Sequence, residues 1–258
     1  MKILDWRNRE RIKITNNIMP NQILNDLKDS DIEYCVSDDL SWLPKNFDII
    51  LFKKNFLTEF KAIKCFHACS PTNLQSYFKD GLTGGNHEKN IKIFNNVFTD
   101  VPKNYRQKAI EEMGRGDEIQ KTYFLCESEN LIKRDGNFLI YGSEYLNTLA
   151  SKLSHQRFSA EDFRERLKGR GIPTIIEVDI NFSFLNDYQI NNIINSSLSD
   201  WGNYYLGNKQ LEELSIIVHE VLPASVIVNH WHPHEIHNPY NYGEWYIPKE
   251  TTCSLCKK

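Results

Sequence analysis

The sequence predicts an α+β fold. Several short apolar runs have strand character, helical segments separate them, and no linker rich in glycine, serine or proline divides the chain. Hydrophobic residues make up 40% and charged residues 25% of the 258 residues, as in an ordinary soluble globular protein. Core strands are predicted at 63–68, 121–126, 138–141, 174–182 and 214–218.

The first sixty residues are predicted to form an accessory layer. A short helical stripe comes first, and strands are predicted at 31–37 and 48–52. Because no flexible linker precedes residue 61, we expect residues 1–60 to pack on a domain formed by residues 61–258.

The stretch from Lys64 to Leu82 is predicted to form a strand, a tight turn and a helix. Ser70 and Pro71 stand in the order of an N-cap and a first helical residue, and Gly81 is placed to end the helix. His67 therefore falls at a strand end, where polar side chains and free backbone groups face a cleft. The alternative is a core histidine bonded to a backbone carbonyl.

Two further predicted strands carry tyrosines. Lys121–Cys126 is rich in aromatic and apolar residues and includes Tyr123, and the run 138–141 ends at Tyr141. Ser143 is expected to cap the helix that follows. The alternative for Tyr123 is that it fills one face of a sheet.

The second half of the chain alternates charged, apolar and polar stretches. Residues 155–171 are predicted to be a charged helix, and residues 186–210 a polar loop rich in asparagine and tyrosine. Residues 174–182 are predicted to be a central strand, because consecutive and alternating apolar residues indicate burial. In the last strand, alternation places Glu213 on the face opposite to Leu214.

Taken in order, three segments resemble the motifs of ADP-ribosyltransferases of the His-Tyr-Glu type. Lys64–Leu82 resembles the family's histidine motif, and Lys121–Cys126 resembles its tyrosine strand. Gln210–Val228 resembles its glutamate strand. That group includes the diphtheria-toxin-like and poly-ADP-ribose-polymerase-like enzymes, and bacterial toxins or defence proteins that share their fold. Ala68 stands where the family usually has glycine.

The resemblance implies both a fold and a reaction. The fold is a split pair of small, mostly antiparallel sheets with flanking helices. The reaction transfers ADP-ribose from NAD, as a substrate, to a macromolecular acceptor that is protein or nucleic acid, and it releases nicotinamide. A carboxylate beside the ribose stabilises the positive charge that develops as the nicotinamide–ribose bond breaks.

The resemblance also assigns roles to residues. The implied catalytic residues are His67, Tyr123 and Glu213. The implied NAD-binding residues are His67, Ala68, Tyr123 and Tyr141, with a tyrosine ring stacked on the nicotinamide. Glu212 and Glu220 are the other candidates for the catalytic glutamate. The alternative for Glu213 is that it is an ordinary surface glutamate before a strand, without a catalytic role.

Charge and hydropathy limit the classes of partner. The formal net charge of −3 does not favour a general nucleic-acid binder, although a local basic stripe is compatible with it. No apolar run reaches the length needed to cross a bilayer, and the N-terminus lacks a signal-peptide pattern. We therefore expect a cytoplasmic protein without a membrane partner.

The C-terminal segment carries residues of the types that bind zinc. Asn229–His237 holds four histidines, and Cys253 and Cys256 follow as a C-x-x-C pair. Pro233 disrupts a regular strand there, so no residue is assigned as a metal ligand and zinc remains open as a cofactor. The other cysteines are interpreted as small apolar residues.

Two alternative functions follow from these residues. If the tail binds zinc, the chain would be a zinc-stabilised binding module without catalysis. A hydrolase or nuclease that uses His67 with a carboxylate ranks below it, because no second histidine or acidic cluster is near His67 in the sequence.

Overall fold

The structure is a computed structural model that describes residues 2–8, 10–114, 121–156, 158–208, 212–241 and 243–256. The chain divides into two compact units. Unit 1 comprises Met1–Cys65, Leu125–Glu127 and Asp179–Ile216, and unit 2 comprises Phe66–Phe124, Ser128–Val178 and Ile217–Lys258. The N-terminal residues thus share a unit with a segment from much later in the chain.

Helices and strands are both present, which confirms the α+β class at the level of mixed secondary structure. Six strands form one sheet in the order β5-β3-β2-β4-β6, with β1 paired to β2 beside that path. They are β1 (Lys2–Leu4), β2 (Phe60–Cys69), β3 (Thr122–Leu125), β4 (Thr174–Asn181), β5 (Ser215–Val218) and β6 (Ile227–Trp231). A small antiparallel sheet joins β7 (Ile236–His237) to β8 (Trp245–Tyr246).

β2 is the middle strand of this order, and its sequence explains why. Phe60, Ile63 and Phe66 are buried, and they lie on both faces of the strand, as expected where a strand is covered on both sides. β1 runs parallel to the beginning of β2. β4 and β6 run antiparallel to each other, with Ile175 opposite Trp231. The predictions at 63–68, 121–126, 174–182 and 214–218 are confirmed as β2, β3, β4 and β5.

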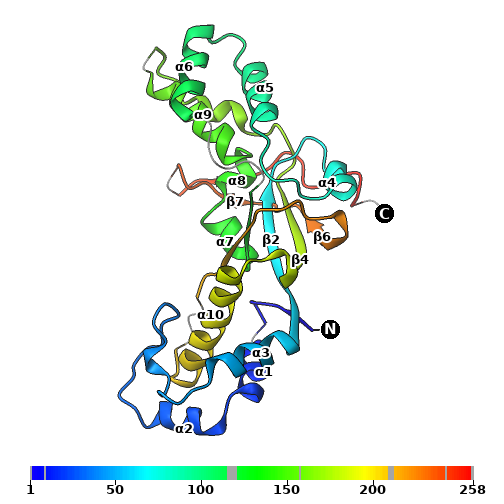
Figure 1. The fold of residues 1–258 in the computed structure, drawn as a ribbon. Coiled ribbons are helices and arrows are strands. Elements are labelled where there is room, and N and C mark those ends of the chain that lie inside the picture. Colours follow the sequence, from blue (N-terminus) through cyan, green and yellow to red (C-terminus); the bar gives the residue numbers. More distant parts are fainter. Residues whose placement is uncertain are drawn as a thin grey trace. The chain divides into compact units, whose positions relative to one another are not determined.

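Unit 1 is mainly helical. Its helices are α1 (Glu10–Ile18), α2 (Asn21–Lys28), α3 (Ile49–Glu59) and α10 (Asp187–Tyr205), with 3₁₀ turns η1 (Leu40–Trp42) and η3 (Phe182–Phe184). α10 packs against α1 and α2, and α1 also packs against α3 (Figure 1). Trp6, Phe56 and Trp201 are among the largest fully buried side chains of this unit.

The prediction of a polar loop at 186–210 is wrong for its described part, because α10 occupies most of it. The Asn186 side chain accepts from the Gln189 N–H, and the Gln189 side chain accepts from the Asn186 N–H, which is a capping box. Ile194, Leu198 and Trp201 recur at helical spacing and are buried. Residues 209 and 210 lie outside the described residues.

The prediction of a strand at 31–37 is also wrong, since this segment has no strand partner. The side-chain amide of Asn203 bonds the backbone of this segment as a neighbouring strand would. Its Oδ1 accepts from the Cys35 N–H and its Nδ2 donates to the Cys35 carbonyl, both at 2.8 Å. Gly202 permits this approach, because an added Cβ would lie 2.5 Å from the Cys35 Sγ.

The strand predicted at 48–52 is wrong too, because the segment forms the start of α3. The Asp48 side chain accepts from the Leu51 N–H at 2.9 Å and so caps the helix. Phe52 and Phe56, four residues apart, are both buried on one side of it. A cap followed by this spacing explains the helix better than the local apolar run does.

Unit 2 holds the remaining helices. They are α4 (Gln75–Asp80), α5 (His87–Val97), α6 (Lys103–Met113), α7 (Ser128–Lys133), α8 (Asn137–Ile140) and α9 (Glu144–His155), with 3₁₀ turns η2 (Phe163–Leu167) and η4 (Ala224–Val226). α9 packs against α5, α6 and η2 (Figure 1). None of the helices in the described residues is long and apolar enough to span a bilayer.

Two segments of unit 2 have another secondary structure than the sequence predicts. Residues 138–141 were expected to form a strand, yet they belong to the short helix α8 and its end; a short apolar run does not distinguish the two. The helix expected at 155–171 is also absent from its described part, since α9 ends at His155 and only the turn η2 follows. The Asp162 side chain accepts from the Arg164 N–H at 3.1 Å and starts that turn.

Candidate functional site

His67 lies near the end of β2, as the sequence predicts. Its Nδ1 is 3.0 Å from the backbone oxygen of Tyr123 on β3. Because a carbonyl only accepts, Nδ1 carries the hydrogen and Nε2 of the neutral ring presents its lone pair. The rings of Tyr77 and Phe124 lie 6.2 and 5.7 Å from the imidazole. Ala68 follows in the same strand and is half-buried.

Burial lowers the pKa of His67, and the hydrogen bond to the Tyr123 carbonyl opposes that shift. The folded protein therefore takes up a proton at His67 less readily than the unfolded chain, in which a histidine has a pKa of about 6.5. The stability that depends on neutral His67 is present above about pH 6.5 and is lost as the pH falls through and below that value.

We expect His67→Asn to reduce the loss of stability on acidification. The free energy of unfolding, measured by urea denaturation at about pH 7 and pH 5, should fall less in this variant than in the wild type. The control replaces the exposed His219. In His219→Asn the free energy of unfolding should fall by as much as in the wild type. An equal fall in His67→Asn would contradict the account of His67.

Tyr123 is the exposed residue of β3. Its neighbours Thr122 and Phe124 are buried, whereas Tyr123 is 47% exposed, so its ring points away from the interior. Its backbone oxygen accepts the hydrogen bond from His67. The structure thus brings two of the predicted site residues together on neighbouring strands of unit 2.

The turn after His67 differs from the prediction. Ser70 and Pro71 do not start the helix, because α4 begins only at Gln75. Instead this segment packs against another part of unit 2. The Ile172 N–H donates to the Pro71 carbonyl at 3.2 Å, and an added Cβ at Gly171 would lie 2.3 Å from the Ser70 oxygen.

Tyr141, which the resemblance places beside the nicotinamide, follows α8 and is only 3% exposed. Its hydroxyl lies 3.3 Å from both Glu165 Oε1 and Asn238 Oδ1. Burial raises the pKa of Tyr141, and the hydrogen bond to Asn238 opposes this. These contacts give the side chain a packing role, and a role in binding NAD stays a prediction.

Glu213 precedes β5 and is exposed. The residue after it, Leu214, is buried, and its carbonyl accepts from the Cys126 N–H at 2.9 Å. Along β5 the exposed Ser215 is followed by the buried Ile216, which confirms the predicted alternation. Glu213 belongs to unit 1, whereas His67 and Tyr123 belong to unit 2.

The neighbouring Glu212 is engaged in the structure of unit 1. Its Oε1 accepts from the Ser199 hydroxyl at 2.9 Å, and its N–H donates to Asp200 Oδ1 at 3.0 Å. Its carbonyl accepts from the Trp6 indole at 2.8 Å. These bonds give Glu212 a structural explanation that does not need a reaction. Glu220, the third candidate, is exposed beyond the end of β5.

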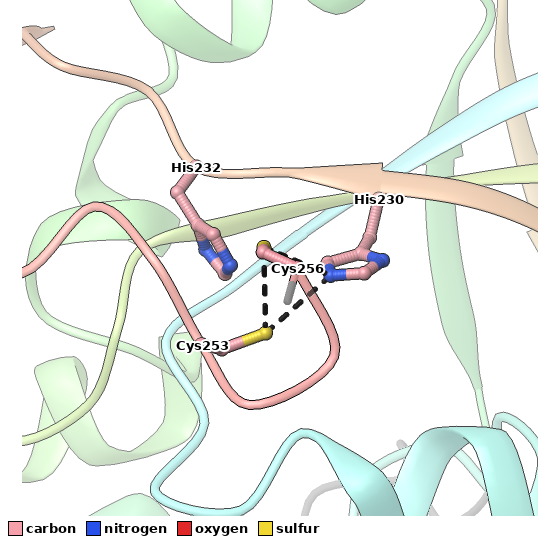
Figure 2. A group of neighbouring side chains, drawn as sticks. All are labelled: His230, His232, Cys253 and Cys256. Carbon is pink, nitrogen blue, oxygen red and sulfur yellow. Dashed lines mark hydrogen bonds between the residues drawn. The ribbon is translucent and has the colours of Figure 1, made fainter. Parts of the chain in front are cut away.

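A group of histidines and cysteines, residue types that can bind a metal ion, also lies in unit 2. It consists of His230, His232, Cys253 and Cys256, and one ligand atom from each lies within 4.8 Å of the others (Figure 2). We call these four residues the His/Cys group. His230 is on β6, His232 follows its end, and the cysteines are on a turn closed by the bond from the Cys256 N–H to the Cys253 carbonyl at 3.1 Å.

The sequence alone does not identify these residues as metal ligands, because histidines at alternate positions need not all face one ion and Pro233 is expected to disrupt a regular strand. β6 ends at Trp231, before the proline, so Pro233 does not affect it. The signal that was available is the pair of short motifs, H-x-H in one segment and C-x-x-C near the C-terminus. What the sequence did not show is that the C-terminal turn returns to β6.

The chain was compared with protein-family models, curated proteins and solved structures. No family model, no curated protein and no solved structure matches it.

Proposed function

We propose that the protein transfers ADP-ribose from NAD to a macromolecular acceptor, protein or nucleic acid, with release of nicotinamide. The observation that carries the proposal is the order of the sheet, in which β5, β3 and β2 are consecutive. β5 follows Glu213, β3 carries Tyr123 and β2 carries His67. The three motifs that suggest the reaction in the sequence are thus on neighbouring strands.

His67 and Tyr123 are assigned to NAD binding. The Tyr123 carbonyl fixes the tautomer of His67, and Nε2 is then an acceptor suited to a ribose hydroxyl. The exposed Tyr123 ring offers a flat π surface to the nicotinamide cation. The backbone of Ala68 would hold the nicotinamide amide, and Tyr141 would line the same pocket.

Glu213 is assigned to the chemistry. When the nicotinamide–ribose bond breaks, the bonding electrons leave with nicotinamide and positive charge develops on the ribose. A carboxylate near that ribose stabilises the charge and can remove the proton of the attacking acceptor group. The acceptor oxygen or nitrogen then forms the new bond to the ribose carbon.

The proposal is tested with NAD that carries a label in its adenylate part. The full chain is incubated with labelled NAD and with separate pools of protein, RNA and DNA, and each pool is analysed for bound label. We expect label in at least one pool and its loss in His67→Ala, with the exposed His219→Ala as the matched control. Intact NAD and no labelled macromolecule in any pool would contradict the proposal.

The His/Cys group favours a second candidate, a zinc-stabilised binding module without catalysis. The same labelling experiment separates the two functions, because such a module leaves NAD intact. Zinc content alone does not separate them, since a transferase can also contain a structural zinc ion.

A further inference from the structure

The three distances among His230, Cys253 and Cys256 match those around a shared metal ion, and the ligand atoms of all four residues lie within 4.8 Å of one another. The two sulfur atoms are 3.6 Å apart, and His230 Nε2 lies 3.4 Å from Cys253 Sγ and 3.5 Å from Cys256 Sγ (Figure 2). A tetrahedral zinc ion, with Zn–S of about 2.3 Å and Zn–N of about 2.0 Å, holds two sulfurs about 3.8 Å apart and a sulfur and a nitrogen about 3.5 Å apart. A disulfide would need about 2.05 Å.

His232 supplies an independent observation. The residue is only 6% exposed, and its Nε2 is buried without a hydrogen-bond partner. Its other nitrogen, Nδ1, lies 3.0 Å from the Pro173 carbonyl and 3.1 Å from the Thr174 hydroxyl. The carbonyl requires the hydrogen on Nδ1, so Nε2 keeps its lone pair. Figure 2 shows the His232 ring pointing toward the cysteines.

A histidine held in this way by a backbone carbonyl is the usual arrangement of a metal ligand, because the carbonyl fixes both the tautomer and the ring orientation. A buried nitrogen with no partner needs an explanation in its surroundings. A metal ion between His232 and the two sulfur atoms provides one.

We propose that His230, His232, Cys253 and Cys256 bind one zinc ion in a closed structural site. Two thiolates and two imidazoles are a common ligand set of structural zinc, and four protein ligands leave no position open for a substrate. This inference goes beyond the proposed transferase activity and does not depend on it.

The zinc site would hold the turn that carries Cys253 and Cys256 against β6 and α4. The histidines come from β6 and the residue after its end, and the turn that carries the cysteines reaches α4, where the Gln75 amide donates to the Ser254 hydroxyl at 3.3 Å. The Phe78 ring of α4 lies 5.3 Å from the His230 ring. Because metal binding is coupled to folding, removal of zinc should release the turn from β6 and α4.

The test uses the full chain and two probes, zinc and Co²⁺. Elemental analysis of the purified protein should give about one zinc per chain, as one closed four-ligand site requires. After chelation, Co²⁺ titration should give the visible absorption of a tetrahedral site and a thiolate charge-transfer band. Cys253→Ser and His232→Ala should each weaken zinc binding by more than the roughly 10–100-fold that is typical of losing an outer-shell partner.

The exposed His234 provides the matched control, since it lies in the same segment outside the His/Cys group. His234→Ala should keep the stoichiometry and the cobalt spectrum. If Cys253→Ser does not fold, Cys256→Ser replaces it, because that side chain is exposed. The proposal is overturned if the wild type takes up no stoichiometric zinc, or if the wild type and the cysteine variants bind zinc equally well.

Discussion

Glu213→Gln is expected to lower the rate of NAD cleavage by roughly 10²–10³-fold, the effect typical of removing one charge-stabilising group. The amide has nearly the shape of the carboxylate but cannot stabilise positive charge on the ribose. NAD binding should be largely kept, since the loss concerns the transition state. Nicotinamide release gives the rate, and calorimetric titration with NAD gives the dissociation constant.

The control is Glu250→Gln, which neutralises another exposed glutamate, and it should cleave NAD at the wild-type rate. Glu212→Ala should mainly lower stability, because it removes the side-chain oxygen that accepts from the Ser199 hydroxyl. If Glu213→Gln cleaves NAD without impairment, Glu213 is removed from the chemistry, and Glu212 and Glu220 become the candidates.

Gly81→Ala is expected to cause a large loss of stability. Gly81 ends α4 with φ +80°, and an added Cβ would lie 2.1 Å from the Leu222 oxygen. Leu82 and Leu222 exchange two backbone hydrogen bonds, at 2.9 and 3.1 Å. An alanine must therefore push two hydrogen-bonded segments of backbone apart.

Gly114→Ala separates the steric clash from the backbone conformation. Gly114 ends α6 with φ +68° and ψ −178°, close to the φ +80° and ψ −165° of Gly81, but nothing lies within 4 Å of its added Cβ, so this variant should lose only about 1–3 kcal/mol for the backbone conformation. Gly81→Ala should lose about 2 kcal/mol more than that, measured as the free energy of unfolding in urea. Equal losses would contradict the close approach of Leu222 to Gly81.

The strands that the sequence predicted correctly are those whose signal is local. β2 is mostly apolar, β4 combines consecutive with alternating apolar residues, and β5 contains the apolar run Ile216–Val218, so neighbouring residues were enough to identify them. The segment 31–37 was misjudged because its partner, the Asn203 amide, is far away in the sequence. α10 was missed because its buried face includes small polar residues, among them Ser197 and Ser199.

The candidate site was predictable only in part for the same reason. The position of His67 at a strand end follows from the local pattern, whereas the exposure of Tyr123 on β3 does not. The hydrogen bond from His67 to the Tyr123 carbonyl depends on strand pairing, which the sequence does not specify. The histidines and cysteines of the His/Cys group can be recognised in the sequence. Their proximity cannot, because it depends on how a turn more than twenty residues after β6 packs against that strand.

Nicotinamide release from NAD by the purified full chain tests the central claim most directly, because it needs no knowledge of the acceptor. Chromatography of the reaction over time should show nicotinamide and an ADP-ribose product in equal amounts, with little of either in Glu213→Gln. If NAD remains intact with the wild type in the presence of protein, RNA and DNA, the chain is not an ADP-ribosyltransferase and the account of its function is contradicted.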